Sequence, residues 1–95
     1  MGAHIGEFEE LVLMSVAILH RSAYGLSVRE FLLEQTTRKT ALRAIHATLY
    51  RLQTKGLLSS DLEGATPTRG GRRKRVFSVT NLGMNAVRDA RQTRD

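Results

Sequence analysis

The sequence predicts one mainly α-helical domain with a β-hairpin, in the order α-α-α-β-β-α. The first half of the chain has helical periodicity. Two runs with strand character then flank a loop that holds the single proline and a Gly-Gly pair, and the final stretch is helical again. Ninety-five residues with 41% hydrophobic content suit one compact core. We expect a single domain over residues 6–91 and a frayed C-terminal tail at 92–95.

Composition excludes several classes of protein. The chain has no cysteine, which rules out a disulfide framework and a thiolate metal site and fits a reduced, cytoplasmic setting. Its most apolar run, residues 11–19, is far shorter than the roughly 20 residues that span a bilayer. Acidic residues precede that run, where a signal peptide would have basic ones. We therefore expect neither a signal peptide nor a membrane span.

The positive charge is concentrated in the last third of the chain. Residues 1–63 carry seven Lys/Arg and seven Asp/Glu, whereas residues 64–95 carry eight and two and so account for the whole net charge of +6. A one-sided cationic segment on an otherwise balanced domain indicates a polyanionic partner. Nucleic acid is the first candidate and an acidic membrane surface is the second.

A first helix is predicted at residues 7–20. Glu7, Glu9 and Glu10 favour a helix N-terminus. The apolar residues that follow cover more than one stripe of the helix. A helix of this kind is either central in the core or part of a subunit interface.

A second helix is predicted at residues 28–35, with Ser27 as its N-cap and Glu30 completing a capping box. The polar run "TTRKT" then forms a turn that ends at Thr40. Thr40 is the expected N-cap of a further helix at residues 41–56.

The helix at 41–56 has two distinct faces and ends at a glycine, Gly56. Its apolar stripe consists of Leu42, Ile45, Leu49 and Leu52. The opposite face carries Arg43, Ala44, Ala47, Arg51 and Thr54, with Tyr50 at its margin and His46 at the boundary between the faces. Arginines separated by small alanines leave room for another surface to approach closely.

A hairpin is predicted next, with strands at 57–64 and 72–80 and a loop that is longer than a tight turn. The second strand alternates, with Phe77 and Val79 on one face and Val76 and Ser78 on the other. The last helix is expected to begin with a cap at Thr80 or Asn81 and to turn inward Leu82, Ala86, Val87 and Ala90.

Two helices joined by a short turn and followed by a hairpin form a helix-turn-helix with a wing. In that fold the 41–56 helix is the candidate recognition helix. Arginine reads guanine in the major groove, and alanine or threonine methyl groups contact the thymine methyl. The alternative is that Arg43 and Arg51 only make the outer face of a core helix soluble.

The run "TRGGRRKR" places five cations around the Gly-Gly pair: Arg69, Arg72, Arg73, Lys74 and Arg75. A solvated charge run, a nuclear localisation signal and a wing are the three interpretations. The wing is favoured because the cluster has no acidic neighbour between Gly64 and Arg88 and continues directly into a strand. If all five cations met phosphates, the slope of log affinity against log salt would be about −4.5.

The residues that a metal site or an enzyme needs are missing from the pattern. His4, His20 and His46 lie in three separate segments, which does not favour a metal site. We find no nucleophile with a base, no paired carboxylates and no phosphate-binding loop. We expect no enzymatic activity and no cofactor.

Four segments in order, "FEELVLMSVAIL", "AYGLSVREFL", "AIHATLYRLQTKGLL" and "RGGRRKRVFSVTNLG", resemble the winged-helix domain of PadR-like transcriptional regulators. The resemblance runs from about Gly6 to Val87. It implies a homodimeric, ligand- or stress-responsive repressor that binds a palindromic operator in double-stranded DNA with its recognition helix and wing. No polar constellation nominates an effector ligand.

The resemblance also implies roles for individual residues. The recognition-helix contacts would be Lys39, Thr40, Arg43, Ala44, His46, Ala47 and Arg51. The wing would consist of Arg69, Gly70, Gly71, Arg72, Arg73, Lys74 and Arg75. The dimer interface candidates are Phe8, Leu11, Val12, Ser15, Leu82 and Val87. Two departures stand out: His46 replaces a tyrosine usual in the family, and many members continue beyond this point into a longer dimerisation helix.

Three hypotheses follow from the sequence. The first is a sequence-specific DNA-binding regulator, in contact with the nucleoid through its DNA. The second is a winged-helix module that binds protein or RNA. The third is a non-specific nucleic-acid binder that depends on the wing alone.

Overall fold

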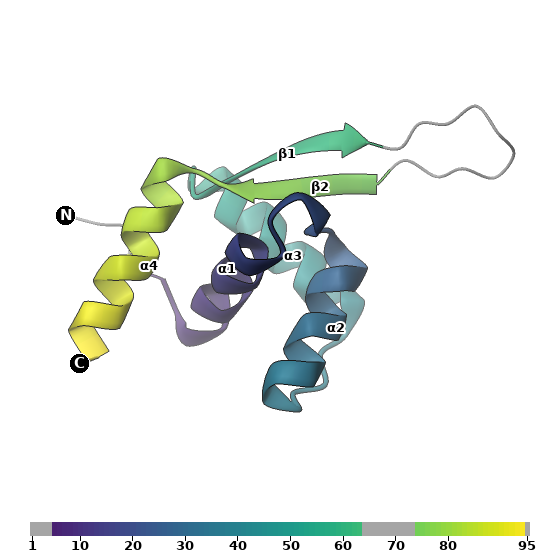
Figure 1. The fold of residues 1–95 in the computed structure, drawn as a ribbon, viewed down its shortest axis with the longest axis horizontal. Helices are drawn as coiled ribbons and strands as arrows, with labels where there is room; N and C mark the ends of the chain where they lie inside the picture. The colour runs from purple at the N-terminus through teal and green to yellow at the C-terminus, as the bar shows by residue number, and fades with distance from the viewer. Residues whose placement is uncertain (1–4, 64–73, 95) are drawn as a thin grey trace, which may run out of the picture.

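The computed structural model describes residues 5–63 and 74–94 (Figure 1). Its elements, in order, are α1 (Glu7–Leu19), the short 3-10 helix η1 (His20–Ser22), α2 (Gly25–Thr36), α3 (Leu42–Thr54), β1 (Leu58–Glu63), β2 (Lys74–Val79) and α4 (Asn81–Arg94). The predicted order α-α-α-β-β-α is confirmed. α4 extends into the predicted tail at 92–95.

α1 is the central helix of the domain. It contacts α2, α3, α4 and β2, and Figure 1 shows it between α4 and α2 with the hairpin above. Val12 and Leu13 are fully buried. The helix ends at Leu19, one residue earlier than predicted, because His20 takes a positive φ of 51° that interrupts the helical backbone.

α2 begins three residues earlier than the sequence predicts, so the assignment of Ser27 as its N-cap and Glu30 as its capping partner is wrong. The N-cap is Tyr24. The hydroxyl of Ser27 accepts a hydrogen bond from the Tyr24 amide at 2.9 Å and donates to the Ser22 carbonyl at 2.6 Å. The serine therefore stabilises the start of α2 from inside the first turn.

The predicted N-cap of α3 is also wrong, because Ala41 and not Thr40 occupies that position, without a side-chain cap. The amides of Ala44 and Ile45 donate to the Ala41 carbonyl, at 3.0 and 3.2 Å. The helix ends at Thr54, two residues before the predicted end at 56, and Gly56 follows the C-cap Lys55 as the predicted stop. Gly56 has a φ of +81° and donates its amide to the Gln53 carbonyl at 2.9 Å, in the left-handed conformation that glycine provides at helix ends.

β1 and β2 pair antiparallel, from Leu58 opposite Val79 to Glu63 opposite Lys74. The amide of Phe77 also donates to the Ala23 carbonyl at 2.7 Å, so the segment before α2 borders the free edge of β2. Phe77 is buried and meets Tyr50 edge to face, with 5.7 Å between ring centroids. Val76 is buried too. Because consecutive side chains of a strand point to opposite faces, β2 is covered on both faces at this point.

Thr80 caps α4, as one of the two predicted alternatives. Its hydroxyl accepts from the Gly83 amide at 3.0 Å and donates to the Gly56 carbonyl at 2.7 Å. A Cβ on Gly83 would lie 2.2 Å from the Leu57 carbonyl oxygen, so only glycine allows this close approach.

The inward face of α4 differs from the prediction in one residue. Ala86 and Val87 are buried and Ala90 is half-buried, as predicted. Leu82 is 48% exposed. It lies over the turn at Gly56, where a Cβ would be 3.6 Å from Leu82 Cδ2, and is therefore outside the core.

Candidate nucleic-acid interface

The two faces of α3 separate in the structure as the sequence predicts. Ile45, Leu49 and Leu52 are fully buried, and Leu42 is half-buried. Four predicted contact residues are exposed on the other side: Arg43, Ala44, Ala47 and Arg51. Burial of the apolar stripe fixes the rotation of the helix, so this cationic face with its small side chains is presented to solvent.

The turn before α3 is fastened to α1. Thr37 has a positive φ of 55° and ends α2. The guanidinium of Arg38 lies 5.1 Å from the centre of the Phe8 ring, a cation–π contact. Lys39 is exposed and Thr40 is half-buried, so the two predicted contacts in this turn lie next to the start of α3.

His46 links α3 to α2. Its imidazole lies directly over Gly25, where an added Cβ would be 2.1 Å from Nε2 and 2.5 Å from Cδ2. The residue is exposed, and it lies at the boundary between the two faces of α3, as predicted. The glycine of the "AYG" segment is therefore required by the space that this histidine occupies.

Arg51 is close to a carboxylate that the sequence did not nominate. Its Nη1 lies 3.9 Å from Glu9 Oε2, while Lys55 Nζ binds both oxygens of Glu9 at 3.0 and 3.1 Å. The side chain of Arg51 is 56% exposed, so the pair is weak. The guanidinium remains accessible from outside.

Glu9 joins the start of α1 to the end of α3. Burial opposes ionisation of this carboxyl. The Gly6 amide, which donates at 3.0 Å, and the cations of Lys55 and Arg51 nevertheless hold the pKa of Glu9 below its ordinary value. Sequence reasoning assigned Glu9 to a helix start only. Lys55 is 46 residues away, and no local pattern signals a pairing at that separation.

The predicted wing lies only partly in the described chain. Arg69, Gly70, Gly71, Arg72 and Arg73 fall outside the described residues. Lys74 and Arg75 are the first two residues of β2.

Lys74 and Arg75 both have partners within the chain. Lys74 Nζ lies 4.3 Å from the centre of the Tyr24 ring. Arg75 Nη1 donates to Ser60 Oγ at 2.9 Å, and that hydroxyl donates to Gln53 Oε1 of α3. The base of the wing is therefore connected to α2 by one cation and to α3 by the other.

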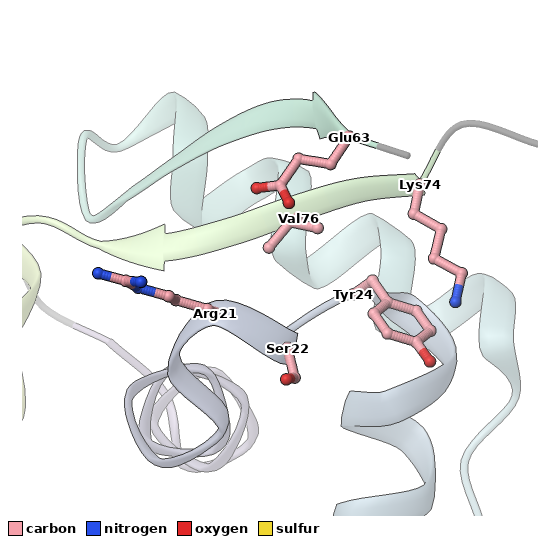
Figure 2. A pocket seen from close by; sticks show the side chains of 6 residues that line it. All are labelled: Arg21, Ser22, Tyr24, Glu63, Lys74 and Val76. Atoms are coloured by element: carbon pink, nitrogen blue, oxygen red, sulfur yellow. The ribbon is translucent and has the colours of Figure 1, made fainter. Parts of the chain in front are cut away.

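An open pocket of about 300 Å³ lies between the segment before α2 and the hairpin. It is lined by Arg21, Ser22, Tyr24, Glu63, Lys74 and Val76. Figure 2 shows the Lys74 side chain running beside the Tyr24 ring at one end, with Arg21 at the other. The lining contains both signs of charge and one aromatic ring.

The dimer interface candidates separate into two groups. Val12, Ser15 and Val87 are buried in the core of the chain itself. For Val12 and Ser15, which lie on α1, this agrees with the alternative that helix 7–20 is central. Phe8 and Leu11 are half-buried, and Leu82 is exposed. Only this second group reaches the surface.

None of the helices in the described ranges has the length and apolar character needed to cross a membrane. No protein-family model and no curated protein sequence matches the chain.

Solved structures resemble the chain over nearly its full length. A PadR family transcription regulator from hypervirulent Clostridium difficile is 24% identical, with a TM-score of 0.74 over 93% of this chain and 86% of that one. A PadR-like transcriptional regulator from Bacillus cereus is 17% identical, with a TM-score of 0.74 and coverages of 90% and 79%. A PadR family regulator from Eggerthella lenta is 21% identical, with a TM-score of 0.70 and coverages of 92% and 75%. The chain therefore has the winged helix-turn-helix fold of the PadR-like transcriptional regulators.

Proposed function

We propose that the protein is a sequence-specific DNA-binding transcriptional regulator that places α3 in the major groove. The observation that carries this proposal is the face of α3, where Arg43 and Arg51 flank the small residues Ala44 and Ala47 and all four are exposed. Arginine forks match the acceptor pair on guanine, and alanines let the helix approach the base edges closely. The PadR-like fold supports this assignment.

His46 has a restricted place in this proposal. Its imidazole is packed over Gly25 at the edge of the helix, so it meets DNA beside the centre of the contact face. Base recognition then depends mainly on Arg43 and Arg51, while Lys39 and Thr40 approach the backbone from the preceding turn.

The wing supplies affinity through phosphates. The excess charge of the chain lies in residues 64–95, and its cations Arg69, Arg72 and Arg73 are proposed phosphate or minor-groove contacts on sequence grounds alone. Gly70 and Gly71 permit close approach of the backbone. Phosphate contacts position a protein on the duplex, whereas base contacts select the sequence.

We further propose that the protein acts as a cytoplasmic homodimeric repressor on a palindromic operator. Two-fold symmetric operators match dimers whose recognition helices lie one helical turn apart. Phe8, Leu11 and Leu82 are the surface residues offered for the subunit contact, with Val12, Ser15 and Val87 packed behind them in the core.

A gel-shift experiment tests the proposal. The wild-type protein is titrated onto its own upstream DNA and onto a scrambled duplex of equal composition at about 0.15 M salt. We expect clear preference for the upstream DNA, since specific sites typically exceed non-specific DNA by about a thousandfold or more. Arg91→Ala, which removes one exposed charge from α4, is the control for Arg43→Ala. Equal affinity for both duplexes would contradict sequence-specific binding.

A further inference from the structure

We propose that residues 22–27, called here the corner, set the angle between the wing and α3, with Tyr24 as the positioning residue. In this proposal Lys74 anchors the wing on Tyr24 and does not serve as an independent DNA contact. The inference rests on the proposed function, because it concerns how the two DNA-binding elements are held relative to each other.

The corner is fixed internally by one hydroxyl group. Ser27 Oγ accepts from the Tyr24 amide at 2.9 Å and donates to the Ser22 carbonyl at 2.6 Å. Ala23, between these residues, is fully buried. The chain therefore turns from η1 into α2 with its backbone held at both sides of Tyr24.

The corner holds β2 at two points. The Ala23 carbonyl accepts the Phe77 amide at 2.7 Å, and the Tyr24 ring lies 4.3 Å from Lys74 Nζ. Phe77 and Lys74 are three residues apart on one strand, which corresponds to roughly 10 Å. Two contacts at that separation fix the direction of the strand, and so the direction in which the hairpin leaves the domain.

The next residue of the corner holds α3. Gly25 lies under the imidazole of His46, with no room for a Cβ between them. Tyr24 and Gly25 are consecutive, so the wing base and the recognition helix are positioned by neighbouring residues. A displacement of this part of the corner changes both positions together.

The contact between Lys74 and Tyr24 is the outer support of the hairpin on this side. The pair borders the open pocket of about 300 Å³ (Figure 2), so packed side chains do not back the strand there. Loss of either partner leaves the Phe77 amide as the remaining contact of the two between the corner and β2. Cation–π pairs at exposed sites contribute enough to change an equilibrium about two- to fivefold.

A double-mutant cycle on DNA affinity tests this inference. Tyr24→Leu, Lys74→Gln and the double variant are titrated onto the upstream DNA at several salt concentrations. We expect each single variant to bind about two- to fivefold more weakly and the double variant to bind no more weakly than the weaker single one. Tyr24→Phe, which keeps the ring, should bind within about twofold of wild type.

A matched control separates the anchor from simple charge. Arg21→Gln removes one cation from the same pocket, but among the described residues the cation–π contact on the Tyr24 ring is made by Lys74 and not by Arg21. We expect its loss of affinity to be smaller than that of Lys74→Gln and to add to that of Tyr24→Leu.

Proton NMR of the DNA-free protein gives an independent readout. The ε-methylene protons of Lys74 should be shifted upfield by the ring in wild type and in Tyr24→Phe, and should return to ordinary positions in Tyr24→Leu. Ordinary shifts in the wild type overturn the inference without any variant. Losses that add in the cycle overturn it while leaving the proposed function intact, whereas a wild type with no preference for upstream DNA overturns both.

Discussion

The outer face of α3 and the base of the wing both carry cations, but the structure holds those cations differently. Arg43 is exposed on α3 and makes no ion pair or side-chain hydrogen bond with the described residues. Lys74 is held on Tyr24, and Arg75 on Ser60. A partnered cation stabilises geometry, whereas an unpartnered one is available to a ligand. The number of basic residues in a segment is therefore not the number of cations available to a ligand.

Arg51 lies between these two cases. It is mostly exposed, yet Glu9 lies 3.9 Å away. Lys55 binds Glu9 more closely, so the interaction of Arg51 with this carboxylate is the weaker of the two. Four experiments, from the largest expected effect to the smallest, test how these two regions are supported and which of their cations are free.

Leu49→Ala should destabilise the core that supports both the outer face of α3 and the base of the wing. Leu49 is fully buried on the inner face of α3, and truncating such a side chain lowers the free energy of unfolding by about 2–5 kcal/mol. Urea unfolding followed by circular dichroism measures the loss. Ala47→Ser, on the exposed face of the same helix, should change the free energy of unfolding by less than about 0.5 kcal/mol. Equal effects of the two variants would contradict the assignment of the faces.

Arg43→Ala compared with Arg75→Gln contrasts a free cation with a partnered one. Loss of a base-reading arginine should weaken specific binding by about 1–3 kcal/mol and relax the choice of sequence, with stability unchanged. Arg75→Gln should instead lower the free energy of unfolding by about 1 kcal/mol, because Ser60 loses its donor, and should keep the sequence preference. Gel shifts of both variants measure the loss of binding, and urea unfolding measures the loss of stability. An unchanged operator affinity in Arg43→Ala would remove it from the interface.

Gly25→Ala should disturb the corner, which contacts both α3 and β2. The new Cβ overlaps the His46 ring, which must move, at a cost of roughly 1–2 kcal/mol. The double variant Gly25→Ala/His46→Ala should recover most of the stability, because the obstructing imidazole is gone. Thermal unfolding of the two variants and of His46→Ala makes the comparison. Failure of the second substitution to restore stability would show that the strain arises elsewhere.

Glu9→Gln should have the smallest effect on the free energy of unfolding, and that effect should depend on pH. The folded-state pKa of Glu9 lies below its ordinary value of 4.5, so the unfolded chain binds its proton more readily. The contribution is therefore present above pH 4.5 and is lost as the pH falls through the folded-state pKa. We expect a loss of about 1 kcal/mol at neutral pH.

The control for Glu9 is its neighbour in the same helical turn. Glu7→Gln removes an exposed carboxylate and should leave stability nearly unchanged. Urea unfolding at pH 7 and below pH 4 gives the comparison. A Glu9→Gln deficit that persists undiminished at the lower pH would show that the carboxylate charge is not responsible.

Much of the fold was predictable from local patterns. The stripe from Ile45 to Leu52 fixed which face of α3 is buried, and Gly56 marked its end, because periodicity and left-handed glycine are properties of neighbouring residues. The starts of α2 and α3 were predicted less well. Ser27 uses its hydroxyl inside the first turn, and Ala41 replaces Thr40 as the cap, since tertiary packing overrides a capping preference of about 1 kcal/mol.

The sequence by itself determined the order of the elements, the amphipathic character of α3 and the concentration of positive charge after residue 63. These features depend on spacing and composition, which are written along the chain. Only the tertiary structure decided which charged groups have partners. Glu9 with Lys55, Lys74 with Tyr24 and His46 with Gly25 are all distant in sequence, and they meet because burial of one apolar core brings their elements together.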